Sequence, residues 1–259
     1  MDLGINGRRA LVCAASRGLG RGCAEALAAE GVDLVINARG VEALEQTAES
    51  LRAQFGITVV PVAADITTEA GREQVLNAAG SVDILVNNAG GPPPGNWRDW
   101  EREDFIAAFD ANTLAPIALM KALFPGMVDR RWGRVVNITS MSVKAPIGVL
   151  GLSNTARTAL TGYVAGVSRE VARHGVVVNN LLPGLHATDR TIMLDQLEAD
   201  TTGEAIDVVK ARRVSTIPTG DYGTSEDFGR MCAYLCSQHV GFMIGQNVLL
   251  DGGFVNTTL

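Results

Sequence analysis

Residues 10–20 read Ala-Leu-Val-Cys-Ala-Ala-Ser-Arg-Gly-Leu-Gly, and this stretch decides the fold. A short apolar run from Ala10 to Ala14 leads into a glycine turn, and a helical stretch follows it to about Glu30. Glycines let the backbone approach a pyrophosphate, and the N-terminus of a helix supplies free N–H groups and a positive dipole. The stretch therefore predicts a strand, a phosphate-binding turn and a helix, in that order.

The alternation of strand and helix continues along the whole chain. Further strands are expected at 33–37, 58–63, 84–87, 133–138, 176–181 and 247–250, and they are short, β-branched and almost continuously apolar. Such strands are typical of a sheet covered on both faces. Because we find no repeat and no linker, we expect one α/β domain over residues 1–259. It is a doubly wound, Rossmann-like parallel sheet of about seven strands, with helices on both faces. The long polar stretch 184–224 is expected to form a lid over a substrate.

Composition restricts the partners and the compartment. The chain is 47% apolar and 19% charged, which suffices for a large core, and its net charge of -6 disfavours binding to nucleic acid. We find no apolar run of the roughly 18 residues that span a bilayer, and no apolar signal segment at the N-terminus. We expect a cytoplasmic protein that binds neither nucleic acid nor membrane.

The cysteines are expected to be small core residues in a reducing compartment. Cys232 and Cys236 lie one helical turn apart with His239 nearby, which leaves a metal site as the alternative. We favour the core role and expect no metal.

Five motifs occur in a specific order. Residues 13–20 are similar to T-G-x-x-x-G-x-G, with Ala14 in place of the first glycine. The others are Asp65-Ile66, Asn87-Asn88-Ala89-Gly90, Pro183-Gly184 and Asp251-Gly252-Gly253. Over nearly its whole length the chain resembles the short-chain dehydrogenase/reductase family, in particular its 3-oxoacyl-acyl-carrier-protein reductases. The resemblance implies a nicotinamide cofactor and a homodimer or homotetramer. The residues that it implies for cofactor binding are Ser16, Arg17, Gly18, Leu19, Gly20, Asp65, Ile66, Asn88, Ala89, Gly90, Pro183 and Gly184.

Charge after the second strand favours NADP(H) over NAD(H). An NAD-specific site usually places a carboxylate there to bind the ribose 2′-hydroxyl, but this chain has Ala38 followed by Arg39. Arg17 lies in the glycine turn. Two guanidinium groups can clamp a 2′-phosphate with charge-assisted hydrogen bonds, so we expect Arg17 and Arg39 to select NADP(H).

The catalytic motif departs from the family pattern. Family members carry Asn, Ser and a Y-x-x-x-K pair, in which the lysine lowers the pKa of the tyrosine that transfers the proton. Asn112 and Ser140 match the first two, but Ser153-Asn-Thr-Ala-Arg157 stands where Y-x-x-x-K is expected. An aliphatic hydroxyl is a far weaker acid than a phenol, and arginine stays protonated. Arg157 takes the place of the lysine that holds the cofactor ribose.

Three hypotheses follow from this departure. In the favoured one, Ser140, Ser153 and Arg157 form a donor cluster around the developing alkoxide of a small carbonyl substrate. The proton then comes from water near Asn112 or from His186, whose side chain titrates near neutrality. In the second, the chain binds the nucleotide without hydride transfer, as a sensor or interaction subunit. In the third, it is a non-redox enzyme such as a dehydratase or an isomerase.

A few other residues are candidates for the cleft or for subunit contacts. Trp97 and Trp100 either wall the cleft or form a packing pair, and Lys144 is either a replacement cation or a surface residue. The basic run 210–213 could bind an anionic carrier or carboxylate, or be solvated. Apolar residues on the helices at 113–130 and 154–174 are expected to contact other subunits. These are Leu119, Leu123, Met127, Leu160, Val164 and Val167.

Overall fold

The computed structural model describes residues 1–258, and a seven-stranded sheet forms its centre. All neighbouring strands are parallel, in the order β3-β2-β1-β4-β5-β6-β7. The strands are β1 (Arg9–Cys13), β2 (Asp33–Ala38), β3 (Val59–Ala63), β4 (Ile84–Asn87), β5 (Gly133–Ile138), β6 (Val176–Pro183) and β7 (Asn247–Leu250). The sequence prediction of a doubly wound parallel sheet is confirmed.

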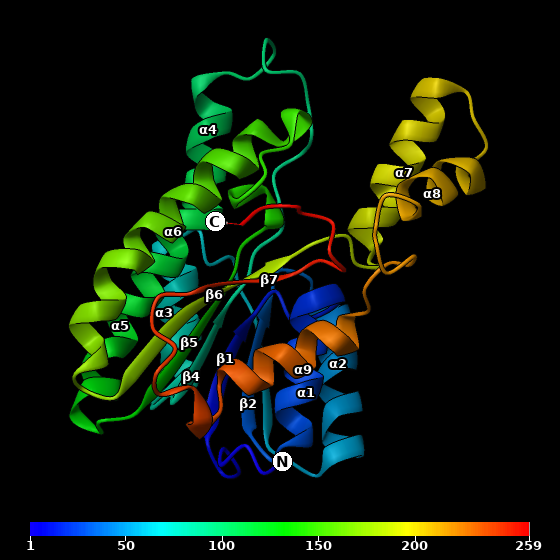
Figure 1. The fold of residues 1–259 in the computed structure, drawn as a ribbon. Helices are drawn as coiled ribbons and strands as arrows, with labels where there is room; N and C mark the ends of the chain where they lie inside the picture. Colours follow the sequence, from blue (N-terminus) through cyan, green and yellow to red (C-terminus); the bar gives the residue numbers. More distant parts are fainter. Residues whose placement is uncertain (259) are drawn as a thin grey trace.

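Helices cover both faces of this sheet. Figure 1 shows α1, α2 and α9 together on one face and α3, α5 and α6 on the other. A separate cluster of buried apolar side chains lies on each face. The helices are α1 (Gly18–Ala29), α2 (Val41–Phe55), α3 (Glu69–Ala79), α4 (Arg102–Phe109), α5 (Ala115–Asp129), α6 (Gly151–Ala172), α7 (Asp189–Thr202), α8 (Ile206–Val214) and α9 (Ser225–Leu235). Because the strands are buried between two helix layers, their side chains are apolar on both faces.

The crossing of α1 and α9 depends on two glycines. A Cβ atom on Gly22 would lie 2.2 Å from the carbonyl oxygen of Ser225, and one on Gly229 would lie 2.1 Å from that of Gly22. Only glycine permits this approach of two helix backbones. The contact fixes the start of α1, which carries the predicted phosphate-binding turn.

Helices α4 and α5 are continuous in the structure. A π-helical turn, Asp110–Leu114, connects α4 to α5, so that Arg102–Asp129 is one helical run. By length and composition alone this run could cross a membrane. However, Leu119, Met120 and Met127 are buried against the sheet, which identifies α5 as a core helix of this fold.

The residues named for subunit contacts lie largely in the core. Leu119, Leu123, Met127, Leu160 and Val164 are buried within the chain, and Val167 packs half-buried against the same cluster. The apolar excess on these helices therefore faces the sheet. The exposed apolar side chains on this run are instead Ile106 and Leu114.

The strand order reverses between β1 and β4. From β1 the chain proceeds outward to β2 and β3, and then returns to place β4 on the other side of β1. The carboxyl ends of β1 and β4 open into a crevice at such a point, which is where parallel α/β sheets bind their ligands. Figure 1 shows α7 and α8 standing beyond this edge of the sheet, away from α4 and α6.

Four asparagines, of which three are buried and Asn247 is half-buried, form a ladder near the same edge. Asn87, Asn137, Asn180 and Asn247 are direct register partners on β4, β5, β6 and β7. Each side-chain amide donates to the next across distances of 2.8, 3.1 and 2.8 Å. Aligned amides strengthen one another in a low-dielectric interior. The ladder therefore holds in register the strand ends from which the site residues project.

Asn137 is the best position at which to test the ladder. Asn137→Leu keeps the volume but leaves the Nδ2 of Asn87 and the Oδ1 of Asn180 without partners. Because each buried orphan group costs about 1–3 kcal/mol, we expect a loss of roughly 2–5 kcal/mol in the free energy of unfolding, measured in urea. Asn77→Leu on the exposed face of α3 is the control, and equal effects of the two changes would refute the role of the ladder.

Candidate active site

A single large cavity lies along the carboxyl edge of the sheet. Its volume is about 1490 Å³, which exceeds the roughly 300–1,000 Å³ typical of small-ligand pockets. It extends from the turn after β1 to the segment 147–153 that leads into α6, and α7 and α8 line its outer side. The cavity has room for a dinucleotide and a second small molecule.

The glycine turn forms one wall of the cavity. Ser16, Arg17, Gly18 and Leu19 line it, and no side chain among residues 1–258 caps the N-terminus of α1. Its first N–H groups are therefore available to an anion. Gly20 lies behind this wall, where a Cβ atom would fall 2.2 Å from the carbonyl oxygen of Ala14. The turn fits a pyrophosphate, and Gly20 serves the packing beneath it.

Ala14 occupies the first-glycine position at a conformational cost. Its φ is +48°, in the left-handed region that favours glycine. Its carbonyl oxygen lies directly beneath Gly20. The close packing of the turn therefore holds an alanine in a strained conformation.

Charged groups follow β2 and β3 in the same cavity. Arg39 and Asp65 both line it, and Ile66 lies beside them. Asp65 accepts hydrogen bonds from the backbone N–H and the hydroxyl of Thr67, at 2.9 and 2.8 Å. These bonds, with a smaller contribution from the charge of Arg39, lower the pKa of Asp65. Arg39 is exposed, so it is free to meet a phosphate.

Arg17 lies in the glycine turn, and its side chain extends toward the start of α7. Its guanidinium lies 3.4 Å from the carboxylate of Asp189, and both side chains are about three-quarters exposed. An exposed pair of this kind is weak. A phosphate in the cavity would therefore compete readily with Asp189 for Arg17.

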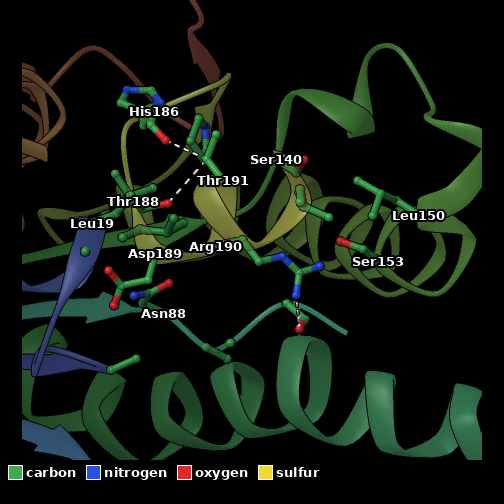
Figure 2. A pocket seen from close by; sticks show the side chains of 18 of the residues that line it. Leu19, Asn88, Ser140, Leu150, Ser153, His186, Thr188, Asp189, Arg190 and Thr191 are labelled. Atoms are coloured by element: carbon green, nitrogen blue, oxygen red, sulfur yellow. Dashed lines mark hydrogen bonds between the residues drawn. The ribbon is translucent and has the colours of Figure 1, made fainter. Parts of the chain in front are cut away.

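The predicted donor cluster is brought together at the other end. Ser140, Ser153 and Arg157 line the same cavity, and Figure 2 shows the two serines on facing segments. Ser153 and Arg157 are one turn apart on α6, and the Nε of Arg157 donates to the Oγ of Ser153 at 3.2 Å. Because that bond uses a lone pair, the Ser153 proton is free to point to a ligand. The Oγ of Ser140 likewise accepts from the backbone N–H of Ser142, at 3.1 Å.

Arg157 is a buried cation. Only 8% of its surface is exposed, and its Nη1 donates to the carbonyl oxygen of Ile138, at the end of β5, at 2.7 Å. Burial, and then the charge of Arg190, lower the pKa of Arg157 to about 10. The group therefore remains protonated at neutral pH, and such a permanent cation is suited to stabilising negative charge rather than to transferring a proton.

Asn112 lies behind the cavity wall. It belongs to the π-helical turn, is buried, and donates from Nδ2 to the carbonyl oxygen of Ala108 at 3.2 Å. It lines a second, small cavity that Asn88 and Arg157 also line. Asn112 therefore borders the same small cavity as Arg157 but does not line the large one.

His186 does not point toward the donor cluster. Its ring packs edge-on against Phe228, with centroids 5.2 Å apart, and Figure 2 shows it turned away from Ser140 and Ser153. Burial is the main cause that lowers its pKa. The expectation that His186 supplies the proton is not supported by this geometry.

Arg190 is the main site residue that sequence reasoning missed. It lies at the start of α7, and its side chain reaches across the cavity to the carbonyl oxygens of Gly91 and Pro92, at 3.1 and 2.6 Å (Figure 2). The sequence signal was its position in the polar segment after Pro183-Gly184. Only the folded course of that segment brings it to the serines.

Other candidates fall outside the donor cluster. Trp97 and Trp100 are not among the residues that line the cavity; Trp100 instead packs edge-on against Phe105 with centroids 6.4 Å apart. Lys144 is exposed and also lies outside the cavity lining. The cysteines are free and buried, and the Nε2 of His239 lies 2.7 Å from the carbonyl oxygen of Asp2. The alternative metal site finds no support, because His239 is engaged elsewhere.

Comparison with known proteins agrees with this geometry. Residues 8–199 match the family model described as short chain dehydrogenase. The chain is 31% identical over 255 residues to the 3-oxoacyl-(acyl-carrier-protein) reductase FabG of Haemophilus influenzae, covering 96% of this chain and 98% of that protein. It is 35% identical over 189 residues to an acetoacetyl-CoA reductase of Cupriavidus necator, covering 72% of each. The L-sorbose reductase of Gluconobacter frateurii, solved with NADPH and L-sorbose, superposes with a TM-score of 0.93 at 29% identity, over 99% of this chain and 100% of that one.

The strain at Ala14 generates a stability prediction. Ala14→Gly removes a left-handed alanine, which costs about 1–2 kcal/mol, and adds the backbone entropy of glycine, about 0.5–1 kcal/mol. We expect a net gain of roughly 0.5–1 kcal/mol in the free energy of unfolding. Ala15→Gly is the matched control, since Ala15 is buried without a positive φ and its replacement should destabilise the chain. Destabilisation by both changes would contradict the proposed strain.

Proposed function

Because this chain belongs to the short-chain dehydrogenase family, we propose that it is an NADP(H)-dependent oxidoreductase that interconverts a carbonyl and a hydroxyl group. The observation that carries the proposal is one continuous cavity with a phosphate-binding turn at one end and the cluster of Ser140, Ser153 and Arg157 at the other. A dinucleotide seated on the turn would lie in the crevice outside the carboxyl ends of the strands, which is the crevice that this cluster also borders.

The residues that would hold NADP(H) are distributed along the cavity. The start of α1 faces the pyrophosphate, Arg17 and Arg39 are placed for the 2′-phosphate, and Asp65 and Ile66 lie at the adenine end. The segment Asn88–Gly90, Pro183, Gly184 and Arg157 line the remainder. The absence of a carboxylate after β2 supports NADP(H) over NAD(H). When bound, the cofactor supplies or accepts the hydride.

The chain's own residues stabilise charge on the substrate oxygen. Ser140 and Ser153 offer hydroxyl protons to that oxygen, and Arg157 orients Ser153 through its Nε. The buried charge of Arg157 favours the alkoxide that develops there, because a low-dielectric site strengthens such interactions. Asn112 and Arg157 border the small cavity behind the site, where a water could be held. Water, rather than a tyrosine, delivers the proton in this scheme.

We also propose a lid, a cellular compartment and an oligomeric state for this protein. The segment 184–224, which contains α7 and α8, acts as a lid that excludes water. The domain is single, the protein is cytoplasmic, and it assembles as a homodimer or homotetramer. Exposed Ile106 and Leu114 support the assembly, since both lie on the continuous run of α4 and α5.

Arg39→Asp tests the choice of cofactor. It replaces the free cation after β2 with the carboxylate that suits a ribose 2′-hydroxyl. We expect the affinity for NADPH to fall by about tenfold or more, the size of one lost charge-assisted hydrogen bond, while NADH binding is kept or improved. Fluorescence titration measures both. Arg102→Asp at an exposed position on α4 is the control, and an unchanged preference in the Arg39 variant would refute the proposed clamp.

Ser140→Ala tests the donor cluster. Removal of one preorganised donor from an oxyanion site usually lowers kcat by about 10²-fold or more. We expect that loss in NADPH oxidation followed at 340 nm with a panel of carbonyl compounds, with NADPH affinity unchanged. Ser50→Ala on exposed α2 should have no effect. Cofactor binding without turnover of any panel member by the unaltered chain would instead favour a nucleotide sensor or a non-redox enzyme.

A further inference from the structure

Two guanidinium groups converge on Gly91 in the cavity. Measured from the position that a Cβ atom on Gly91 would occupy, the Cζ and Nη2 of Arg190 lie at 3.5 Å, and the Nη2 of Arg157 lies at 3.9 Å. One arginine comes from α6 and the other from the start of α7. Because Gly91 has no side chain, a small space remains at its Cα atom, and both guanidinium groups border this space.

Neither of these arginines has an acidic partner within residues 1–258. The arginines of α8 on the outer side of the cavity do have acidic partners: Arg212 pairs with Glu198 and Glu204, and Arg213 with Asp195 and Glu198. Arg212 and Arg213, the two arginines of the basic run 210–213, are therefore engaged with carboxylates. Arg17, in the glycine turn, has only its weak, exposed pair with Asp189. Among residues 1–258, the side chains of Arg157 and Arg190 donate hydrogen bonds only to carbonyl oxygens and to the Ser153 hydroxyl.

Hydrogen-bonding capacity remains on both groups. The described chain provides no hydrogen-bond partner for the Nη2 of Arg157 or the Nε of Arg190. Burial lowers the pKa of each, and for Arg157 the charge of Arg190 adds to the effect. Two neighbouring cations without a counterion are costly in a protein interior, and an anion placed between them offsets that cost.

The space is next to the proposed reaction centre rather than to the phosphate sites. Arg157 bonds the end of β5, whereas Arg39 follows β2, three strands away in the sheet. At a strand spacing of about 4.8 Å, this separation is about 14 Å. Figure 2 shows Arg190 reaching toward Ser153 from the opposite side of the cavity. An anion held there would therefore belong to the molecule whose oxygen meets Ser140 and Ser153.

We propose that Arg157 and Arg190 form a carboxylate-binding site, and that the substrate is an oxo acid or its hydroxy-acid counterpart. The planar guanidinium fork suits a carboxylate. Ile147, Val149, Leu150, Leu194 and Leu197 also line this cavity, so it offers apolar surface to the remainder of the substrate. This inference rests on the proposed function for the reaction, but the binding of the acid does not require hydride transfer.

The test compares acids with their uncharged esters. Binding of pyruvate, 2-oxobutyrate and acetoacetate, and of their methyl esters, is measured by calorimetry on the full chain, with and without NADP⁺. We expect at least one acid to bind about tenfold or more tightly than its ester, as for a hydrogen-bonded charge. Arg190→Gln should abolish that difference, and Arg190→Lys, which keeps the charge without the fork, should retain part of it.

Arg173→Gln is the matched control. It makes the same change of charge at the exposed C-terminal end of α6, about 24 Å from Arg157 along the helix, and should leave the preference intact. Circular dichroism checks the fold of each variant. The proposal is overturned if every acid binds no better than its ester, or if Arg190→Gln retains the preference. It is also overturned if Arg190→Gln weakens only NADP⁺ or inorganic phosphate.

The outcomes for the two proposals are separable. An Arg190-dependent preference for acids, without oxidation of NADPH, supports the carboxylate site and contradicts the oxidoreductase. Equal turnover of an acid and its ester supports the oxidoreductase and contradicts the carboxylate site.

Discussion

The hydrogen bond from the buried guanidinium of Arg157 to the carbonyl oxygen of Ile138 organises the catalytic end of this protein. It anchors α6 to the end of β5 and places a permanent positive charge beside the cavity. The same side chain holds Ser153, so a hydroxyl and a cation stand where a tyrosine and a lysine are usual in the family. Such a pair suits electrostatic stabilisation of an oxyanion, whereas a phenol suits proton transfer. The chemistry of the site follows from this exchange.

The scaffold around the buried charge of Arg157 is held by hydrogen bonds between asparagine side chains and by close contacts at glycines. The asparagine ladder aligns four strand ends through hydrogen bonds between their side-chain amides. The glycine contacts of α1 with α9 and of Gly20 with Ala14 fix the opposite wall of the cavity. The left-handed Ala14 shows that this packing overrides a local conformational preference. Binding of the cofactor and stabilisation of the substrate thus depend on two separate, preformed parts of one sheet edge.

Much of this could be predicted from the sequence, because the signals were local. Apolar runs of strand length identified all seven strands, and the ordered motifs placed Arg39, Asp65 and Ser140 along one edge. The structure added what depends on long-range packing. In the sequence, Asn137 and Asn180 look like ordinary strand residues, and only the register of the sheet shows that they are partners. The ring of His186 packs against Phe228 on α9, a contact that the sequence does not indicate. Arg190 belonged to a polar segment without a recognisable motif, and only its fold over the cavity brought it to Gly91.

In the proposed reaction, a hydride is transferred at this site without the help of a tyrosine. The most direct measurement is a reaction of the full chain with NADPH deuterated at the transferable C4 position, using the same oxo acids, with the product examined by mass spectrometry and NMR. Deuterium bound to the new carbinol carbon is the result that the account predicts. Tight binding of the labelled cofactor, with no deuterium in any product across the panel, would contradict it.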